Sequence, residues 1–183
     1  MDYVVDFQGF HDNGNNFILK ELCIQSIENG KLVGARKQYL FLPPFDFRHL
    51  SDKKKKEVNY LKNRFHKFSW NCGLQDYDEV YSILKNLNGA KCIYVKGSEK
   101  KQVLEKELNR RIIDLETLNC PSLSVLKQQD SFVIDCPFMH NTRNCAVNNV
   151  YLLSRWVLHY WNSKCEEHCE RTKRVDCWDC AYY

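Results

Sequence analysis

Apolar residues in the first part of the chain gather in three runs that polar turn residues separate. The turns Asp12-Asn13-Gly14-Asn15 and Asn29-Gly30-Lys31 combine Asn with Gly, residues that readily reverse the chain between two strands. Pro43-Pro44 ends the third run, because proline lacks the N–H that a strand ladder needs. We therefore expect an antiparallel meander of three strands, at Tyr3–Phe7, Asn16–Ile27 and Lys37–Leu42.

Beyond Pro44 the apolar spacing changes, and helical periods alternate with short apolar strands. Ser51 can cap a helix that carries Val58, Leu61 and Phe65 on one face. The same reasoning predicts helices at about 76–87, 98–108 and 146–160, and strands at Lys91–Val95 and Arg111–Leu115. Three antiparallel strands followed by α/β units indicate an α/β fold with one mixed five-stranded sheet flanked by helices. We assign residues 1–162 to this domain and residues 163–183 to a Cys-rich C-terminal extension.

Length and composition fit one domain of ordinary size. The 183 residues are enough to bury a core without disulfides, and 44% of them are hydrophobic. No apolar run approaches the roughly 18 residues of a membrane span, and Met1 to Phe10 contains two acids and no basic residue. We therefore expect an intracellular protein, of the cytoplasm or nucleus, that does not enter a membrane. The net charge of +4 is compatible with nucleic acid, with a protein partner or with neither.

Seven of the ten cysteines lie between Cys120 and Cys180. Clustered cysteines in a reducing compartment are metal ligands more often than disulfides. Cys136, His140 and Cys145 follow a C-x3-H-x4-C spacing, and Cys120 precedes them. Three thiolates and one imidazole would make a tetrahedral structural zinc site that ties the last helix to the sheet. The alternative is a set of buried thiols and a histidine with ordinary hydrogen bonds.

The C-terminal extension contains a second cysteine cluster. Its four members follow a C-x3-C-x7-C-x2-C spacing: Cys165, Cys169, Cys177 and Cys180. This spacing favours a second zinc ion, although the seven-residue gap is shorter than in most zinc ribbons. A disulfide-linked or unstructured tail is the alternative, and the participation of His168 stays open.

Two groups of basic residues are candidates for contact with nucleic acid. Arg171, Lys173 and Arg174 lie among the cysteines of the extension, where nearby glutamates cancel much of their field. Lys53 and Lys54 open a run of four lysines at a helix start, which is more often a solvated face than a phosphate site.

Aromatic residues between Phe65 and Asn71 are interleaved with basic ones, and they either stack on bases or belong to the core. Gly97-Ser98 has the character of a turn and helix cap rather than of a phosphate loop. We therefore expect no nucleotide cofactor.

Three segments resemble the motifs of the DnaQ-like (DEDDh) exonucleases, whose domain has an RNase H-like fold. Val4 to Phe10 resembles the first motif, a strand ending in Asp-x-Glu, and Lys91 to Ser98 occupies the place of the second. His140-Asn141-Thr142-Arg143-Asn144-Cys145 resembles the third motif, His-x4-Asp. The resemblance extends over roughly residues 1–160. It implies a site in which four carboxylates hold two magnesium ions.

The chain departs from this pattern at three of the four acids. Asp6 is kept, but Gln8 replaces the second acid, Lys100 lies where the third is expected, and Cys145 closes the last motif. Magnesium depends on hard oxygen ligands, so the resemblance implies a catalytically degenerate nuclease. The Maelstrom domain is a similar DnaQ-like fold that lacks the usual acids, carries a Glu/His/Cys-type zinc site and has an implied role in RNA silencing. By this analogy we expect structural zinc, with RNA or a protein of RNA metabolism as the partner.

Other interpretations stay open. The chain is also similar to uncharacterised arthropod proteins that share the segments at 6–10 and 120–123, which implies no activity. An active metal-dependent 3′–5′ exonuclease would need a rearranged site built from Asp6, Glu99, Asp114 (or Glu116) and His140. A zinc-stabilised interaction module would instead bind a protein partner through residues 165–180.

Overall fold

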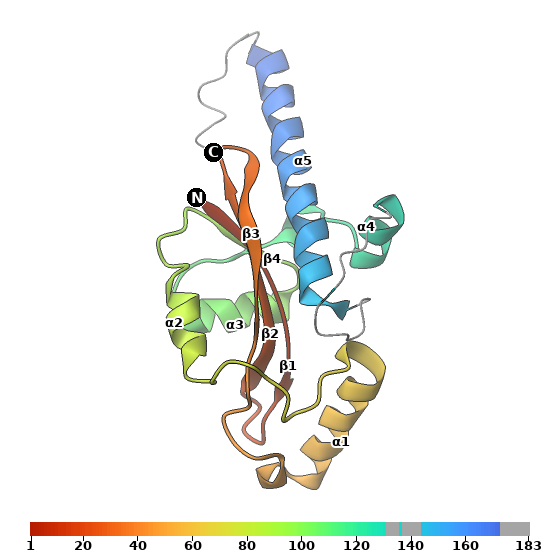
Figure 1. Ribbon diagram of the computed structural model, residues 1–183. Helices are drawn as coiled ribbons and strands as arrows, with labels where there is room; N and C mark the ends of the chain where they lie inside the picture. Colours follow the sequence, from red (N-terminus) through yellow and green to blue (C-terminus); the bar gives the residue numbers. More distant parts are fainter. Residues whose placement is uncertain (131–135, 137–143, 173–183) are drawn as a thin grey trace.

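The computed structural model describes residues 1–130, 136 and 144–172, with only the backbone of residues 166–172. Its strands are β1 (Asp2–His11), β2 (Phe17–Glu28), β3 (Lys31–Leu40), β4 (Ile93–Val95) and β5 (Ile113–Asp114). They form one sheet in the order β3-β2-β1-β4-β5 (Figure 1). Neighbours among β1, β2 and β3 are antiparallel, whereas β4 pairs parallel with β1 and β5 pairs parallel with β4. The predicted mixed five-stranded sheet is confirmed.

Helices cover both faces of the sheet (Figure 1). One face packs against α5 (Ala146–Thr172), which in turn contacts α4 (Leu123–Gln129). The opposite face is covered by α2 (Glu79–Lys85) and α3 (Ser98–Leu108). Below the N-terminal end of α5 lies α1 (Asp52–Leu61), which continues into a π-helical segment, Lys62–His66. Short 3-10 turns lie at Phe47–His49 and Leu115–Leu118.

The core has two sides because alternate residues of a strand point to opposite faces of a sheet. Val5 and Phe7 of β1 belong to a buried apolar cluster with Leu104 of α3. Val4 belongs to the cluster on the other face, together with residues of α5. Asp6 has the same parity as Val4, and its side chain therefore points toward α5.

The hairpin between β2 and β3 is longer than predicted. Asn29 and Gly30 both have positive φ, 51° and 68°, which suits a tight reversal between two strands. The chain re-enters the sheet at once, so β3 begins at Lys31 and not at the predicted Lys37. Residues 31–36 have a weak strand pattern of their own and are held by pairing with β2, for example Val33 opposite Ser26.

The helices confirm some predicted boundaries and correct others. Ser51 caps α1, since its Oγ accepts a hydrogen bond of 3.4 Å from the Lys54 N–H. Ser98 is the first residue of α3 and not its cap; Gly97, with φ of 104°, precedes it. The sequence did not predict α4, and α5 continues past Tyr160 and across residue 162 without a break.

None of the helices within the described residues is long and apolar enough to cross a membrane.

Candidate functional site

The first turns of α5 bring two groups of polar side chains against the sheet. One is centred on Asp6 of β1, which is only 1% exposed. The Nζ atom of Lys100, from α3, forms an ion pair with Oδ1 of Asp6. Asn149 of α5 donates a hydrogen bond of 2.8 Å from Nδ2 to the other oxygen, Oδ2. These three residues are called the Asp6 cluster below.

Both oxygens of the Asp6 carboxyl are therefore engaged by protein groups. Burial raises the pKa of this carboxyl, while the Lys100 ammonium and the Asn149 amide act in the opposite direction. Because the ammonium belongs to a side chain of α3, its positive charge is a permanent part of the cluster, unlike that of a bound ion. The cluster thus satisfies a buried acid without any metal ion.

The α5 residue that reaches Asp6 is Asn149, whereas the sequence placed the closing position of the third motif at Cys145. Asn149 follows Cys145 by one helical turn, so the two residues lie on the same face of the helix start. Helical periodicity counted from Cys145 would have indicated it. Asp6 is the one carboxylate of this cluster, beside the ammonium of Lys100 and the amide of Asn149.

The second group is centred on Glu21 of β2, which is fully buried at 0% exposure. A carboxylate oxygen of Glu21 and the Sγ atoms of Cys136 and Cys145 all lie within 4.8 Å of one another. Cys145, directly before α5, is also fully buried. These three residues are called the Glu21 cluster. Within residues 1–130, 136 and 144–165 no other three His, Cys, Asp or Glu side chains gather so closely.

Two elements orient the Glu21 carboxylate. The backbone N–H of Ala146 donates a 3.0 Å hydrogen bond to Oε2, at the N-terminus of α5, where the helix dipole favours negative charge. Gln38 of β3 donates to Oε1 at 2.7 Å, and the same amide nitrogen lies 3.5 Å from Sγ of Cys136. Burial, together with the charge of Glu21, raises the pKa of the Cys145 thiol.

The Glu21 cluster could hold a metal ion. Two sulfur atoms and one carboxylate oxygen favour a metal with affinity for sulfur, and they suit magnesium poorly. Three protein ligands leave room for a fourth in a tetrahedral site.

Glu21 provides a carboxylate close to Gln8, which replaces the second acid of the first motif. It lies directly opposite Gln8 in the β1–β2 ladder, and cross-strand partners project on the same face of a sheet. A carboxylate is therefore present one strand away from the position where the first motif lacks one. Glu21 was not predictable from sequence spacing, because no spacing rule connects a residue of β2 with residues 136 and 145. The available signal was a charged residue inside the apolar run of β2, whose burial requires a partner.

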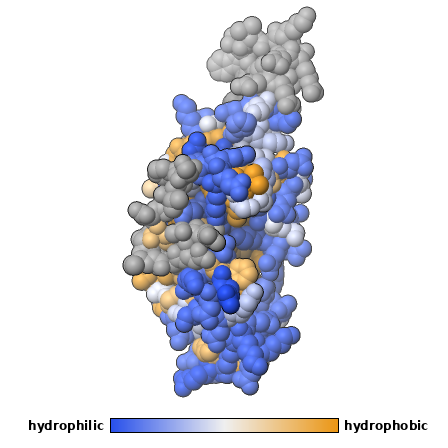
Figure 2. Space-filling view, turned by 90° about the vertical axis from the view of Figure 1, so that its right-hand side faces the viewer, coloured by the Kyte–Doolittle hydropathy of each residue, from blue (hydrophilic) through white to orange (hydrophobic). Residues whose placement is uncertain are grey.

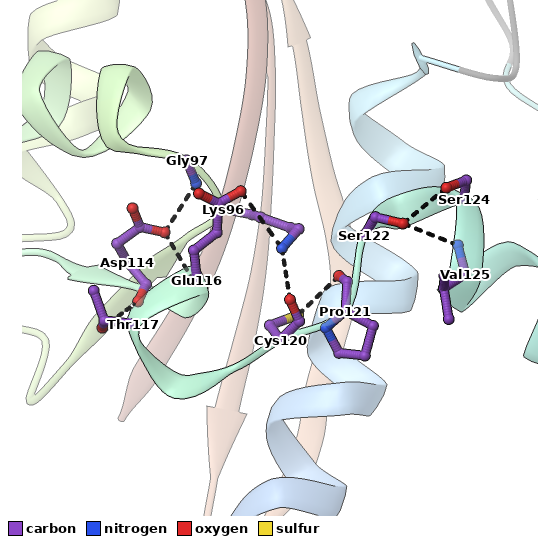
Figure 3. A network of polar contacts seen from close by, with 10 residues as sticks. All are labelled: Lys96, Gly97, Asp114, Glu116, Thr117, Cys120, Pro121, Ser122, Ser124 and Val125. Atoms are coloured by element: carbon purple, nitrogen blue, oxygen red, sulfur yellow. Dashed lines mark hydrogen bonds and ion pairs between the residues drawn. The ribbon is translucent and has the colours of Figure 1, made fainter.

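Cys120, which the sequence grouped with Cys136 and Cys145, is not part of the Glu21 cluster. Its side chain packs in the apolar cluster beneath α5, with Leu126 among its neighbours, and Sγ lies 3.6 Å from the carbonyl oxygen of Pro121. Burial raises the pKa of this thiol to about 11. The backbone around it is also held, since Lys96 Nζ donates to the Cys120 carbonyl oxygen at 2.8 Å (Figure 3).

Asp114 acts as a turn cap next to Cys120 (Figure 3). Its Oδ1 accepts hydrogen bonds from the backbone N–H groups of Gly97, at 2.9 Å, and Glu116, at 3.0 Å. The Glu116 side chain pairs with Lys96 at 3.6 Å. Asp114 and Glu116 thus stabilise the connection between β5 and the segment that leads to α4.

Glu99 is exposed and pairs with His11 at 3.3 Å. Among the described residues, neither Glu99 nor Asp114 joins Asp6 in a group of metal ligands. The fourth member of the rearranged nuclease site, His140, lies outside the described residues, so this alternative stays a hypothesis.

Several other candidates lie outside the described residues: His140, Lys173, Arg174, Cys177 and Cys180. Cys165 is half-buried on α5, and the backbone of Cys169 and Arg171 continues the same helix. Lys54 pairs with Glu57 at 2.9 Å, whereas Lys53 is exposed.

No protein-family model matches the chain, and no curated protein matches it. Among solved structures, the chain is similar to Exonuclease X in complex with 5′ overhanging duplex DNA, with a TM-score of 0.53. The sequences are 11% identical, and the match covers 89% of this chain and 92% of that chain. At this identity the likeness shows the fold alone. The chain therefore has the α/β, RNase H-like exonuclease fold that the order of its elements predicts.

Proposed function

We propose that this protein is a catalytically degenerate member of the exonuclease-like fold that binds RNA and carries zinc as a structural ion. The observation that supports it most is the ion pair between Lys100 and Asp6. A lysine against the remaining acid puts a fixed positive charge where a metal ion would otherwise bind. Asn149, which also contacts Asp6, is a neutral amide, and so is Gln8, two residues further along β1.

The chemistry of hydrolysis explains why a lysine in place of a metal ion removes nuclease activity. Two-metal nucleases depend on the ions both to generate a hydroxide at neutral pH and to stabilise the leaving oxygen. An ammonium group can attract a phosphate, but it has no coordination position for a water molecule. The Asp6 cluster can thus contribute to binding of a phosphodiester and lacks the means to cleave it.

The Glu21 cluster supports zinc as the bound metal. Cys136 and Cys145 enclose His140 in the sequence, with three residues on one side and four on the other. This spacing is typical of zinc ligands, and an imidazole would complete a closed tetrahedral site. One zinc ion held there would offset two of the three negative charges of Glu21 and two thiolates and would link the start of α5 to β2. The Glu/His/Cys character of the set parallels that of the Maelstrom domain.

RNA is the ligand that the fold and the analogy favour together. Exonuclease X shares the fold and is described in complex with duplex DNA. The Maelstrom analogy adds RNA biology to a fold without its catalytic acids. A protein of RNA metabolism is the competing ligand, and direct measurement separates the two.

Binding and digestion should be measured on the same sample. The purified chain is incubated with fluorescein-labelled RNA, with magnesium, with manganese and with neither. We expect saturable binding in all three conditions and intact RNA throughout. Digestion that disappears in Asp6→Ala would overturn the degenerate interpretation. Absence of RNA binding, with the protein folded, would overturn the RNA assignment.

A further inference from the structure

We infer that the outer surface of α1 and the π-helical segment after it is the site that binds single-stranded nucleic acid. This inference rests on the RNA binding proposed above and specifies where it takes place. The surface is called the α1 face. It consists of an exposed aromatic pair, Tyr60 and Phe65, and five exposed cations, Lys53, Lys56, Lys62, Arg64 and Lys67.

Residues 52–67 concentrate the positive charge of the protein. They include seven Lys or Arg and two Asp or Glu, a net charge of +5. The whole chain carries +4, so all its other residues together carry −1. Neutralisation of phosphates by Lys and Arg supplies much of the affinity of proteins for nucleic acids. The α1 face is the part of the chain where this electrostatic attraction is strongest.

The acids of this segment do not cancel the outer cations. Asp52 pairs with Lys55 at 3.6 Å, and Glu57 pairs with Lys54 at 2.9 Å. Within the described part of the chain, the remaining basic residues form no salt bridge: Lys53, Lys56, Lys62, Arg64 and Lys67. A solvated helix face commonly alternates acids with bases, whereas this one leaves a set of cations free for phosphate.

The aromatic pair lies among these cations. Tyr60 is 58% exposed and Phe65 is 41% exposed, and their ring centroids are 5.6 Å apart with an interplanar angle of 61°. The core of this segment is built by other residues, namely the buried Val58, His66 and Phe68. Bases can stack on the exposed part of such rings whatever their sequence, and such stacking requires unpaired bases.

The π-helical segment determines which side chains face outward. It ends at Lys67, which has a left-handed φ of 62°, and π-helical segments are frequent at functional sites. His66 turns inward against Phe10, with ring centroids 4.8 Å apart, and Phe65 beside it turns outward. The backbone carbonyl of Phe65 accepts a hydrogen bond of 2.9 Å from the side chain of Asn144, two residues before α5.

The α1 face therefore adjoins the end of α5 at which both polar clusters lie. Figure 1 shows α1 below the N-terminal end of α5. The lower end of the molecule in Figure 2, where α1 lies, is predominantly hydrophilic. A single strand bound along α1 would reach toward the Asp6 cluster, whose lysine could contact its phosphates.

The first test is fluorescence anisotropy with a fluorescein-labelled oligouridylate of about 12 nucleotides, a length within the usual span of single-strand sites. Tyr60→Ala/Phe65→Ala should weaken binding by about tenfold or more, because each stacked base is worth roughly that factor. Tyr81→Ala is the matched control, since Tyr81 of α2 is 62% exposed and lies away from this segment. It should bind as the wild type does.

The second test measures the charge contribution. Lys56→Gln/Lys62→Gln/Arg64→Gln should reduce the slope of log affinity against log salt by about 2, as expected for three lost phosphate contacts to a single strand. The control replaces three exposed lysines elsewhere, Lys31→Gln/Lys85→Gln/Lys106→Gln, and should leave the slope near that of the wild type. All the changed side chains are exposed, so melting temperatures should stay close to wild type.

The outcomes separate this inference from the proposed function. If the wild type binds the oligouridylate and both sets of variants bind equally well, the α1 face is not the site, and RNA binding stands. If the wild type binds no oligouridylate, both proposals fall. If a duplex of the same length binds equally and the aromatic variant has no effect, the single-strand assignment is overturned. An oligodeoxythymidylate of equal length distinguishes RNA from DNA.

A measurement on the wild type guards against variants that fold poorly. Photocrosslinking with a 4-thiouridine oligonucleotide should yield crosslinked peptides from residues 52–67. Crosslinks confined to other parts of the chain would overturn the inference.

Discussion

The Asp6 cluster and the Glu21 cluster lie on neighbouring strands under the same helix start, and they satisfy a buried carboxylate in opposite ways. Asp6 is neutralised by Lys100, a cation that belongs to the chain. Glu21 receives hydrogen bonds from Ala146 and Gln38, and it lies against two thiols. In the first cluster, side chains of the folded protein themselves neutralise the carboxylate. The second brings together three side chains that could hold a metal ion.

The β1–β2 register shows how the two clusters are related. Gln8 lies opposite Glu21, so the acid missing from one strand is present on the next. Asp6 lies opposite Cys23, whose thiol belongs to the same buried cluster as Cys145. Under the proposed function, this part of the sheet would keep a position for a cation, with sulfur atoms in place of most oxygen ligands.

The largest expected effect comes from breaking the Glu21 cluster. Cys145→Ala should remove one zinc ion per chain, because three good ligands are needed to hold a structural ion. Structural zinc contributes apparent binding free energies on the order of 10 kcal/mol, and 1 kcal/mol corresponds to about 2–4 °C in a domain of this size. We expect elemental analysis to show one zinc fewer than wild type and the melting temperature to fall by more than about 10 °C.

Cys120→Ala is the control, since Cys120 is also buried but packs outside the cluster. It should retain the zinc content of wild type and lose about 1 kcal/mol from packing. Loss of zinc from Cys120→Ala, with zinc retained by Cys145→Ala, would contradict the assignment.

Removing the cation from the Asp6 cluster should have the next largest effect. Lys100→Ala leaves a buried carboxylate without its partner, which costs about 3–5 kcal/mol in the free energy of unfolding. Lys101→Ala, the adjacent residue, breaks only a surface pair with Glu105 at 3.7 Å and should cost less than about 0.5 kcal/mol. Urea titration measures both. Equal costs for the two variants would mean that Asp6 does not depend on Lys100.

Lys20 adds a third kind of buried charge to the comparison. Its ammonium donates to the carbonyl oxygens of Phe41, Trp70 and Cys72, and desolvation by burial lowers its pKa to about 8. Between about pH 8 and its ordinary pKa near 10.5 the unfolded chain holds this proton and the native chain releases it. The unfolded state then binds more protons, so this group makes stability rise with pH in that window.

The rise contributed by Lys20 should approach about 3 kcal/mol, at 1.36 kcal/mol for each pKa unit. Lys20→Met should remove this rise in stability. Chemical denaturation of both proteins between about pH 7.5 and pH 10.5 measures it. The difference between the two proteins isolates Lys20 from cysteines that titrate at similar pH. An identical pH dependence in both would show that the Lys20 proton is not coupled to folding.

The smallest expected effect restores oxygen ligands to the Asp6 cluster. Gln8→Glu/Lys100→Asp/Asn149→Asp would place four acids at this end of the sheet. Manganese at about 100 times its dissociation constant should then stabilise the variant by about 2.7 kcal/mol. A thermal melt with and without manganese measures the shift, and wild type should show none. Equal shifts in both proteins would mean that Lys100 does not block the site.

Much of the fold follows from local patterns. The strands, the Ser51 cap and the start of α5 at Ala146 were predictable, because turn residues and apolar periodicity act over a few residues. The helix α4 and residues 31–36 of β3 were not, because packing against α5 and pairing with β2 stabilise them. Cys136 and Cys145 carried a recognisable metal-ligand spacing. Glu21 and Asn149 carried none, because each joins its cluster from a different element.

The sequence alone gives the order of strands and helices and a thiol-rich segment before α5. It also gives Gln8, Lys100 and Cys145 at positions where the resemblance implies acids. Only the tertiary structure decided that Glu21 and not Cys120 accompanies Cys136 and Cys145, and that Lys100 neutralises Asp6. Element order depends on contacts between near neighbours in the chain. The clusters depend on sheet register and helix docking, which bring together residues more than ninety positions apart.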